Sequence, residues 1–101
     1  MADMELIARW KATTALLDRA RHALPKPLPP HELAYASLST QLDEYLEHNE
    51  LELALDTLME LGDLTTPRGA FWRDLERAAE IMNLNNRRQA FRAAPIPPAD
   101  E

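Results

Sequence analysis

The prolines of this chain divide it into helix-forming stretches. All eight lie at 25–30, at 67 and at 95–98, and each lacks a backbone N–H and has a fixed φ angle, which interrupts a helix. The residues between them include no valine and only two glycines, and they are rich in Leu, Ala and Glu. This composition favours helix over strand. The sequence therefore predicts an all-α fold, a small four-helix bundle with a short fifth helix as an optional addition.

Apolar residues recur at helical spacing within each stretch. We expect a single bundle domain at 1–94 and a mobile Pro-rich tail at 95–101. Trp10 and Trp72 occur at helical spacing and are expected in the core. The PKPLPP segment at 25–30 should be an extended spacer, with an SH3-type ligand as the less favoured alternative. The expected helices are 3–24, 30–48, 50–61 and 68–82, with the fifth at 86–93.

A short connection should join the second and third helices into an antiparallel hairpin. It consists of His48 and Asn49, which leaves room only for a tight reversal. Asn49 followed three residues later by Glu52 has the pattern of a capping box. We therefore expect Asn49 to cap the start of the third helix.

The boundary between the third and fourth helices carries two further signals. Gly62 is expected to end the third helix in a left-handed conformation. Thr66 followed by Pro67 has the pattern of an N-cap and a first helical residue. Both signals predict a loop that is confined to a few residues.

The middle of the chain is acidic and contains no compensating basic residue. Between Pro27 and Pro67 there is no Lys or Arg, whereas the whole chain has 11 basic and 17 acidic residues and a net charge of −6. The carboxylates of this segment are Glu32, Asp43, Glu44, Glu47, Glu50, Glu52, Asp56, Glu60 and Asp63. Such a block repels itself and nucleic acid. It indicates either a binding surface for a basic protein or simply a solvated acidic face.

Periodicity places part of this charge on one helix face. Glu52, Asp56 and Glu60 follow at i, i+4 spacing and should form a ridge. Each like-charge pair costs about 0.2–0.5 kcal/mol, and no lysine lies between them to offset it. Tyr45 is a candidate aromatic anchor within the field, with core packing as the favoured alternative. The expected partner-binding residues are Asp43, Glu44, Tyr45, Glu47, Glu50, Glu52, Asp56, Glu60 and Asp63.

No catalytic or metal-binding pattern stands out. The chain has no cysteine, and its two serines, Ser37 and Ser39, do not lie in a G-x-S-x-G elbow. Glu44 and His48 are four residues apart and could share a metal-binding face, but no second histidine lies nearby. No Gly-rich loop is present to hold a nucleotide. We expect no catalytic residue, no metal, no cofactor and no nucleic-acid partner.

One segment resembles a known family. The run YLEHNELELALDTLMELG at Tyr45–Gly62 combines an aromatic–apolar pair, His-Asn-Glu, and an alternation of acidic with Leu and Ala residues. It is similar to a segment of small bacterial immunity proteins of the MafI-type immunity family and of related antitoxin-like proteins of polymorphic toxin systems. The resemblance implies a small helical protein that binds and neutralises the C-terminal domain of a secreted toxin. It carries over the class of partner and no interface residue.

The expected function is therefore that of an immunity protein for a cognate basic toxin domain, for which a nuclease is one candidate. A helical regulatory or adaptor protein that binds an unrelated basic protein is the alternative, and an enzyme subunit is a third, less favoured one. The acidic N-terminus lacks the pattern of a signal peptide, and no apolar run approaches the about 18 residues that span a bilayer. We expect a cytoplasmic, non-enzymatic protein with no membrane partner, monomeric when free.

Overall fold

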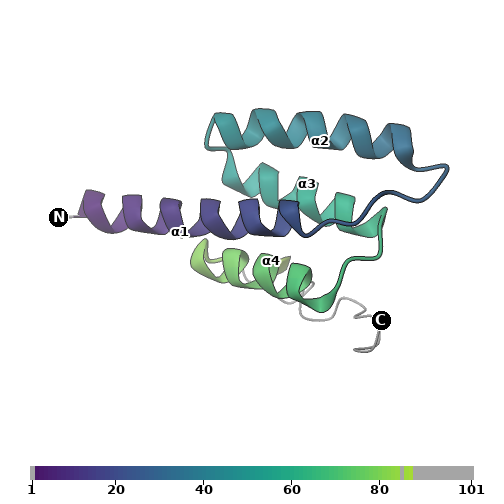
Figure 1. The fold of residues 1–101 in the computed structure, drawn as a ribbon. Helices are drawn as coiled ribbons and strands as arrows, with labels where there is room; N and C mark the ends of the chain where they lie inside the picture. Colours follow the sequence, from purple (N-terminus) through teal and green to yellow (C-terminus); the bar gives the residue numbers. More distant parts are fainter. Residues whose placement is uncertain (1, 85, 88–101) are drawn as a thin grey trace.

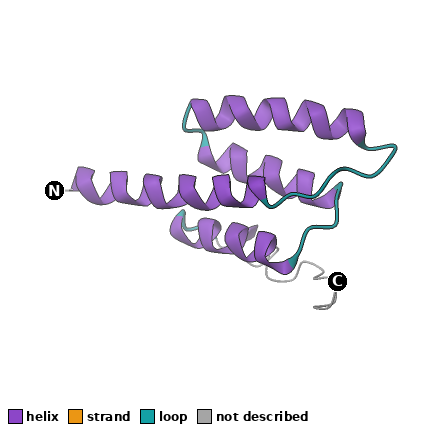
Figure 2. Cartoon of the chain, in the orientation of Figure 1, coloured by secondary structure: helices purple, strands orange, loops and turns teal. Residues whose placement is uncertain are grey.

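The structure is a computed structural model that describes residues 2–84, 86 and 87. Within these residues it contains helices and no strand (Figure 2), so the predicted all-α class is confirmed. The expected fifth helix falls outside the described residues except for Asn86 and Arg87, which are helical. The expected tail at 95–101 also lies outside them. The helices are α1 (Ala2–His22), α2 (Glu32–Glu47), α3 (Leu51–Asp63) and α4 (Gly69–Ile81).

The helix α3 lies at the centre of the bundle. It contacts all three other helices. The helix α2 packs mainly on α3, whereas α1 packs mainly on α4 and also on α3. The α2–α3 pair is an antiparallel hairpin, as predicted (Figure 1). The helix α1 is the longest, and its N-terminal half projects beyond the ends of the other three (Figure 1).

The core is built from apolar residues of all four helices. Seven of the 13 residues of α3 are buried, which fits a central helix whose apolar positions nearly encircle it. By contrast, α2 buries only Leu42, so it covers the bundle from outside. The fully buried large side chains are Phe71, Leu17, Leu42, Leu55, Leu58, Leu61, Leu75 and Thr13.

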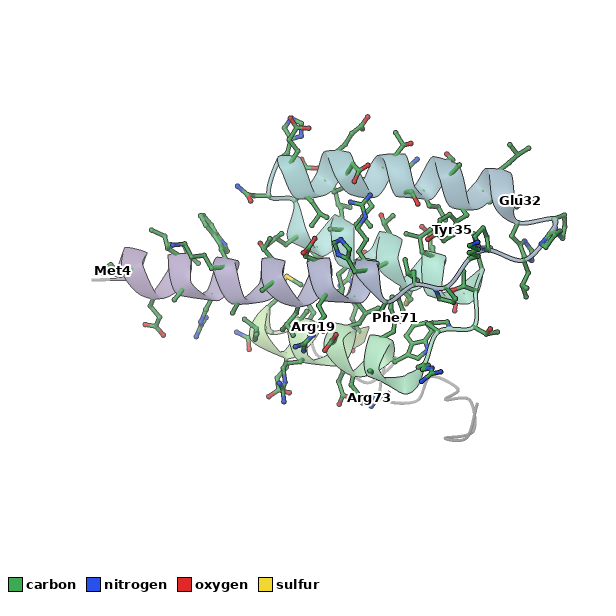
Figure 3. The ribbon with its side chains drawn as sticks, in the orientation of Figure 1. Met4, Arg19, Glu32, Tyr35, Phe71 and Arg73 are labelled. Atoms are coloured by element: carbon green, nitrogen blue, oxygen red, sulfur yellow. The ribbon has the colours of Figure 1, made fainter. Side chains whose placement is uncertain are left out.

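The two ends of α1 have different surroundings. Its C-terminal half buries Leu17 and Ala20, and Arg19 donates two hydrogen bonds to the Asp74 carboxylate of α4, at 2.9 and 2.6 Å (Figure 3). Its N-terminal half projects beyond the other described helices (Figure 1), which leaves much of it exposed to solvent. Trp10 is therefore 49% exposed, and the prediction that it lies in the core is wrong, whereas Trp72 is buried as predicted.

The hairpin connection is built differently from the predicted capping box. Asn49 has a φ of 57° and follows the last residues of α2. Its N–H donates to the Leu46 carbonyl at 3.3 Å, and the Glu50 N–H donates to the Tyr45 carbonyl at 2.8 Å. These two bonds form a Schellman motif, which closes the C-terminus of α2. The N-cap of α3 is Glu50, with no side-chain cap bond, so the predicted capping role of Asn49 and Glu52 is wrong.

Gly62 lies inside α3 and is not its terminator. The helix continues to Asp63, and no described glycine has a positive φ. A Cβ at this position would lie 2.6 Å from Cη2 of Trp72 and 2.7 Å from Cε2 of Phe71. The glycine is required because the two aromatic rings of α4 approach the α3 backbone, and the predicted left-handed cap is wrong.

The α3–α4 loop also departs from the prediction. Thr66 and Pro67 precede α4, whose N-cap is Arg68 with no side-chain cap bond, so the predicted Thr66–Pro67 start is wrong. The buried Thr65 hydroxyl instead donates to the Leu61 carbonyl at 3.1 Å. This bond adds a second donor to a carbonyl of the last turn of α3, which also accepts the Leu64 N–H at 3.3 Å.

Candidate functional site

The predicted partner-binding residues lie on two helices and on the turn between them. All are exposed except Tyr45 and Asp56, which are half-buried. They do not form one continuous acidic face, because different basic residues contact different members. The structure divides them into a group on α2, a ridge on α3 and a group at the hairpin tip.

On α2, Asp43 is neutralised by a residue of the first helix. It forms an ion pair with Arg21 of α1, which lies 22 positions earlier in the sequence. This contact ties the outer helix α2 to α1 across the bundle. Asp43 therefore contributes to the fold, and it offers less charge to a partner than its sequence context indicates.

On α3, the ridge residues share a face as predicted, but a cation lies on them. Arg87 donates two hydrogen bonds to the Asp56 carboxylate, at 2.6 and 2.9 Å, and its Nη1 lies 3.1 Å from Glu52. The hydrogen bond to Asp56, aided by both carboxylates' charges, raises the pKa of Arg87. No lysine lies within the ridge, but Arg87 offsets the repulsion at two of its three positions.

Glu60 and Asp63 complete the exposed face of α3 toward its C-terminus. Neither forms an ion pair with another described residue. They lie one to two helical turns beyond Asp56. This part of the ridge remains negative but is short.

The third group, which we call the acidic tip, consists of Glu44, Glu47 and Glu50. All three are exposed, and none forms an ion pair within the part of the chain that the structure describes. They surround His48, the C-cap of α2, whose Nδ1 lies 2.9 Å from the Glu44 carbonyl oxygen. That hydrogen bond, and then the charges of Glu47, Glu50 and Glu44, raise the pKa of His48.

Tyr45 belongs to the edge of the core. It is half-buried and packs against the buried cluster, as does Tyr35. The alternative of core packing, favoured from the sequence for Tyr45, is thus confirmed. Only part of the Tyr45 side chain is exposed beside the tip.

An apolar groove, which we call the α1 groove, lies directly beside the acidic tip. It has a volume of about 590 Å³, within the range of about 300–1,000 Å³ that is usual for ligand-sized cavities. Sequence reasoning missed it because Trp10 was expected in the core. Its lining residues are Ile7, Trp10, Lys11, Thr14, Ala15 and Asp18 of α1 with Leu46 and Asn49 of the hairpin.

The surroundings of the carboxylates do not form a metal site. Among residues 2–84, 86 and 87, no group of three or more His, Cys, Asp or Glu side chains is placed to hold a metal ion. Glu52 and Asp56 are paired with Arg87 and do not join the Glu44–His48 pair in one ligand set. No helix in the described part of the chain has the length and apolar character needed to cross a membrane.

The chain was compared with known proteins in three ways. No family model, no curated protein and no solved structure matches it.

Proposed function

We propose that this chain is an immunity protein that binds and neutralises a basic bacterial toxin domain in the cytoplasm, without catalysis, through its acidic helical surface. One observation carries the proposal. The three carboxylates of the acidic tip are exposed and unpaired within the described residues, although arginines pair with acidic residues elsewhere. The chain thus leaves one compact patch of charge for an external counter-charge.

The physical benefit of such a patch is fast association. Clustered carboxylates repel one another, and a cationic surface placed opposite them relieves that repulsion. The same field attracts a basic partner from a distance and raises the association rate by about 10- to 1,000-fold at low salt. An inhibitor that must act before a toxin reaches its target gains most from a high association rate.

The ridge on α3 has a smaller part in this proposal than the sequence indicated. Arg87 already occupies Glu52 and Asp56, so a partner would have to displace it or contact the remaining carboxylates, Glu60 and Asp63. The tip requires no such exchange. The resemblance of the run Tyr45–Gly62 to immunity proteins covers both the tip and α3, and it supports the toxin as the class of partner.

The test is protection of a producing cell. The product of the neighbouring gene is expressed alone, with the wild-type chain, and with a variant that carries Glu44→Gln, Glu47→Gln and Glu50→Gln. We expect the wild-type chain to restore growth and to co-purify with that product, and we expect the variant to lose both properties.

A matched control replaces three exposed carboxylates away from the tip and the ridge, with Glu5→Gln, Glu32→Gln and Glu80→Gln. This control removes the same net charge but keeps the tip, so it should protect nearly as well as the wild-type chain. Complex formation without protection would favour the adaptor alternative. Neither complex nor protection would contradict the proposed function.

A further inference from the structure

We propose that the α1 groove receives an amphipathic, cationic helix of the partner, with its apolar face on Ile7, Trp10 and Leu46 and its basic face toward the acidic tip. This inference rests on the proposed function and specifies which kind of partner segment binds and where. It is argued from three properties of the groove: its exposed apolar residues, its shape and its charge.

Exposed apolar side chains are concentrated at this place. Of the seven large apolar side chains that are exposed in the described part of the chain, four lie between Met4 and Trp10. Met4 marks the far end of the projecting part of α1 (Figure 3). Ile7 and Trp10 are 45% and 49% exposed and lie on one face of the helix, three residues apart. A contiguous apolar face of this kind marks an interaction site.

The shape fits an elongated occupant. One wall follows α1 from Ile7 to Asp18, which is about three helical turns, and the other wall is the end of the hairpin at Leu46 and Asn49. An amphipathic helix placed in such a groove is anchored by apolar residues at i, i+3 or i+4, and i+7. A compact small molecule would fill only part of this length.

The charge around the groove selects a cationic occupant. Leu46 and Asn49 are directly bonded in the chain to Glu47 and Glu50 of the tip, and Asp18 contributes a further exposed carboxylate from α1. The nearest cation to Asp18 in the described part is His22, at 3.6 Å, when that histidine is protonated. Lys11 is the basic residue of the lining, so the basic face of the occupant should turn away from it and toward the tip.

A second copy of this chain is a poorer occupant. A two-fold pairing through the groove would place the same patch of both molecules at one interface. The two acidic tips would then meet, and like-charge contacts at an interface disfavour such a pairing. Each copy also has a net charge of −6. The charge therefore favours a basic partner over self-association.

The experiment uses the full-length, ¹⁵N-labelled chain and a designed probe. The probe is a helical peptide of about four turns with leucines on one face and lysines on the other; a matched peptide carries glutamine in place of lysine. We expect the lysine peptide to shift the Trp10 indole N–H and the Leu46 and Asn49 amides, and the glutamine peptide to bind much more weakly.

Variants then locate the site. Trp10→Ala should weaken binding of the lysine peptide by about tenfold or more, as for a central aromatic contact, and Lys11→Gln should strengthen it about twofold by removing a like charge. Leu33→Ala removes a side chain that is 87% exposed at the far end of α2 and should change nothing. Because Trp10 lies outside the core, thermal melting should show that its variant is folded.

Four results would overturn the inference. One is equal binding of the two peptides. Another is a set of shifts that maps to Glu60 and Asp63, with binding unaffected by Trp10→Ala. The third is sedimentation of the free chain as a dimer that Trp10→Ala dissociates. The fourth is a Trp10 indole that is already shielded within the free monomer.

This inference and the proposed function can fail separately. If Trp10→Ala protects cells against the toxin as well as the wild-type chain does, the proposed docking in the α1 groove is wrong and the proposed function stands. If the peptide binds at Trp10 but the neighbouring gene product is neither bound nor neutralised, the proposed function is wrong, whereas the α1 groove remains a docking site for a cationic helix.

Discussion

Replacing Gly62 by alanine should destabilise the protein even though alanine is the better helix former. Gly62 has no positive φ and lies inside α3, so the substitution gains about 0.8–1 kcal/mol of helix propensity. Against this, the new Cβ would meet ring atoms of Trp72 and Phe71 at 2.6 and 2.7 Å. Both rings are buried and contact each other edge to face, with centroids 4.9 Å apart, so they cannot swing aside cheaply.

The size of the effect follows from these two terms. Overpacking a well-filled core costs about 1–3 kcal/mol. Contacts below 3.0 Å with two buried rings favour the upper part of that range, about 2–3 kcal/mol, so the net loss should be about 1–2 kcal/mol. For a domain of this size, each kcal/mol lowers the melting temperature by about 4–8 °C. The assay is chemical and thermal denaturation followed by circular dichroism. Gly69→Ala, the same change at the half-exposed first residue of α4, serves as the control and should not destabilise the protein.

A second substitution separates close packing from a left-handed helix cap. Asparagine tolerates the left-handed region better than alanine does, so a cap at Gly62 would make Gly62→Asn the milder change. Packing against the rings makes it the more severe change, because asparagine is larger. Gly62→Ala with wild-type stability, or Gly62→Asn more stable than Gly62→Ala, would refute the close approach of α4 to α3.

Three further predictions concern the ridge, the tip and the turn. Arg87→Ala should lower the free energy of unfolding by about 0.5–1 kcal/mol, as expected for a partly exposed ion-pair network, and by less at high salt. The control Arg77→Ala should leave stability unchanged. The pKa of His48 is raised above 6.5. Its contribution to stability is therefore complete below the unfolded-state pKa and is lost as pH rises through the folded-state pKa. NMR titration should show that Glu50→Gln lowers the folded-state pKa of His48. Asn49→Gly should preserve or increase stability because φ is 57°, whereas Asn49→Ala should cost about 1 kcal/mol; an Asn49→Gly variant with a lower denaturation midpoint than Asn49→Ala would contradict the left-handed C-terminal role.

Features encoded by neighbouring residues could be predicted from the sequence. Helix positions were correct to within a few residues, because apolar periodicity and the prolines act locally. The end of the second helix at His48 followed from the same local rules. Asn49 and Gly62 show the limit of these rules, since asparagine serves both as an N-cap and as a left-handed C-terminal residue, and glycine serves both in caps and in close packing.

Features that depend on tertiary contacts could not be predicted. The pairing of Arg87 with Asp56 joins residues 31 positions apart, and no local spacing reveals it. Trp10 has the periodicity of a core residue, but whether a helix lies opposite depends on the lengths of α2, α3 and α4. The division of the acidic block into paired residues and a free tip therefore required the structure.

The central claim is that the acidic tip attracts a basic partner, and the association rate measures this most directly. Stopped-flow binding of the co-purified toxin domain is recorded over a range of salt concentrations, with the wild-type chain and with Glu44→Lys, Glu47→Lys and Glu50→Lys combined. We expect the wild-type rate to fall as salt rises past about 0.15 M, where the screening length is about 8 Å, and the variant to be slower by about tenfold or more at low salt. A wild-type rate that does not depend on salt, together with an unchanged rate for the variant, would contradict the claim.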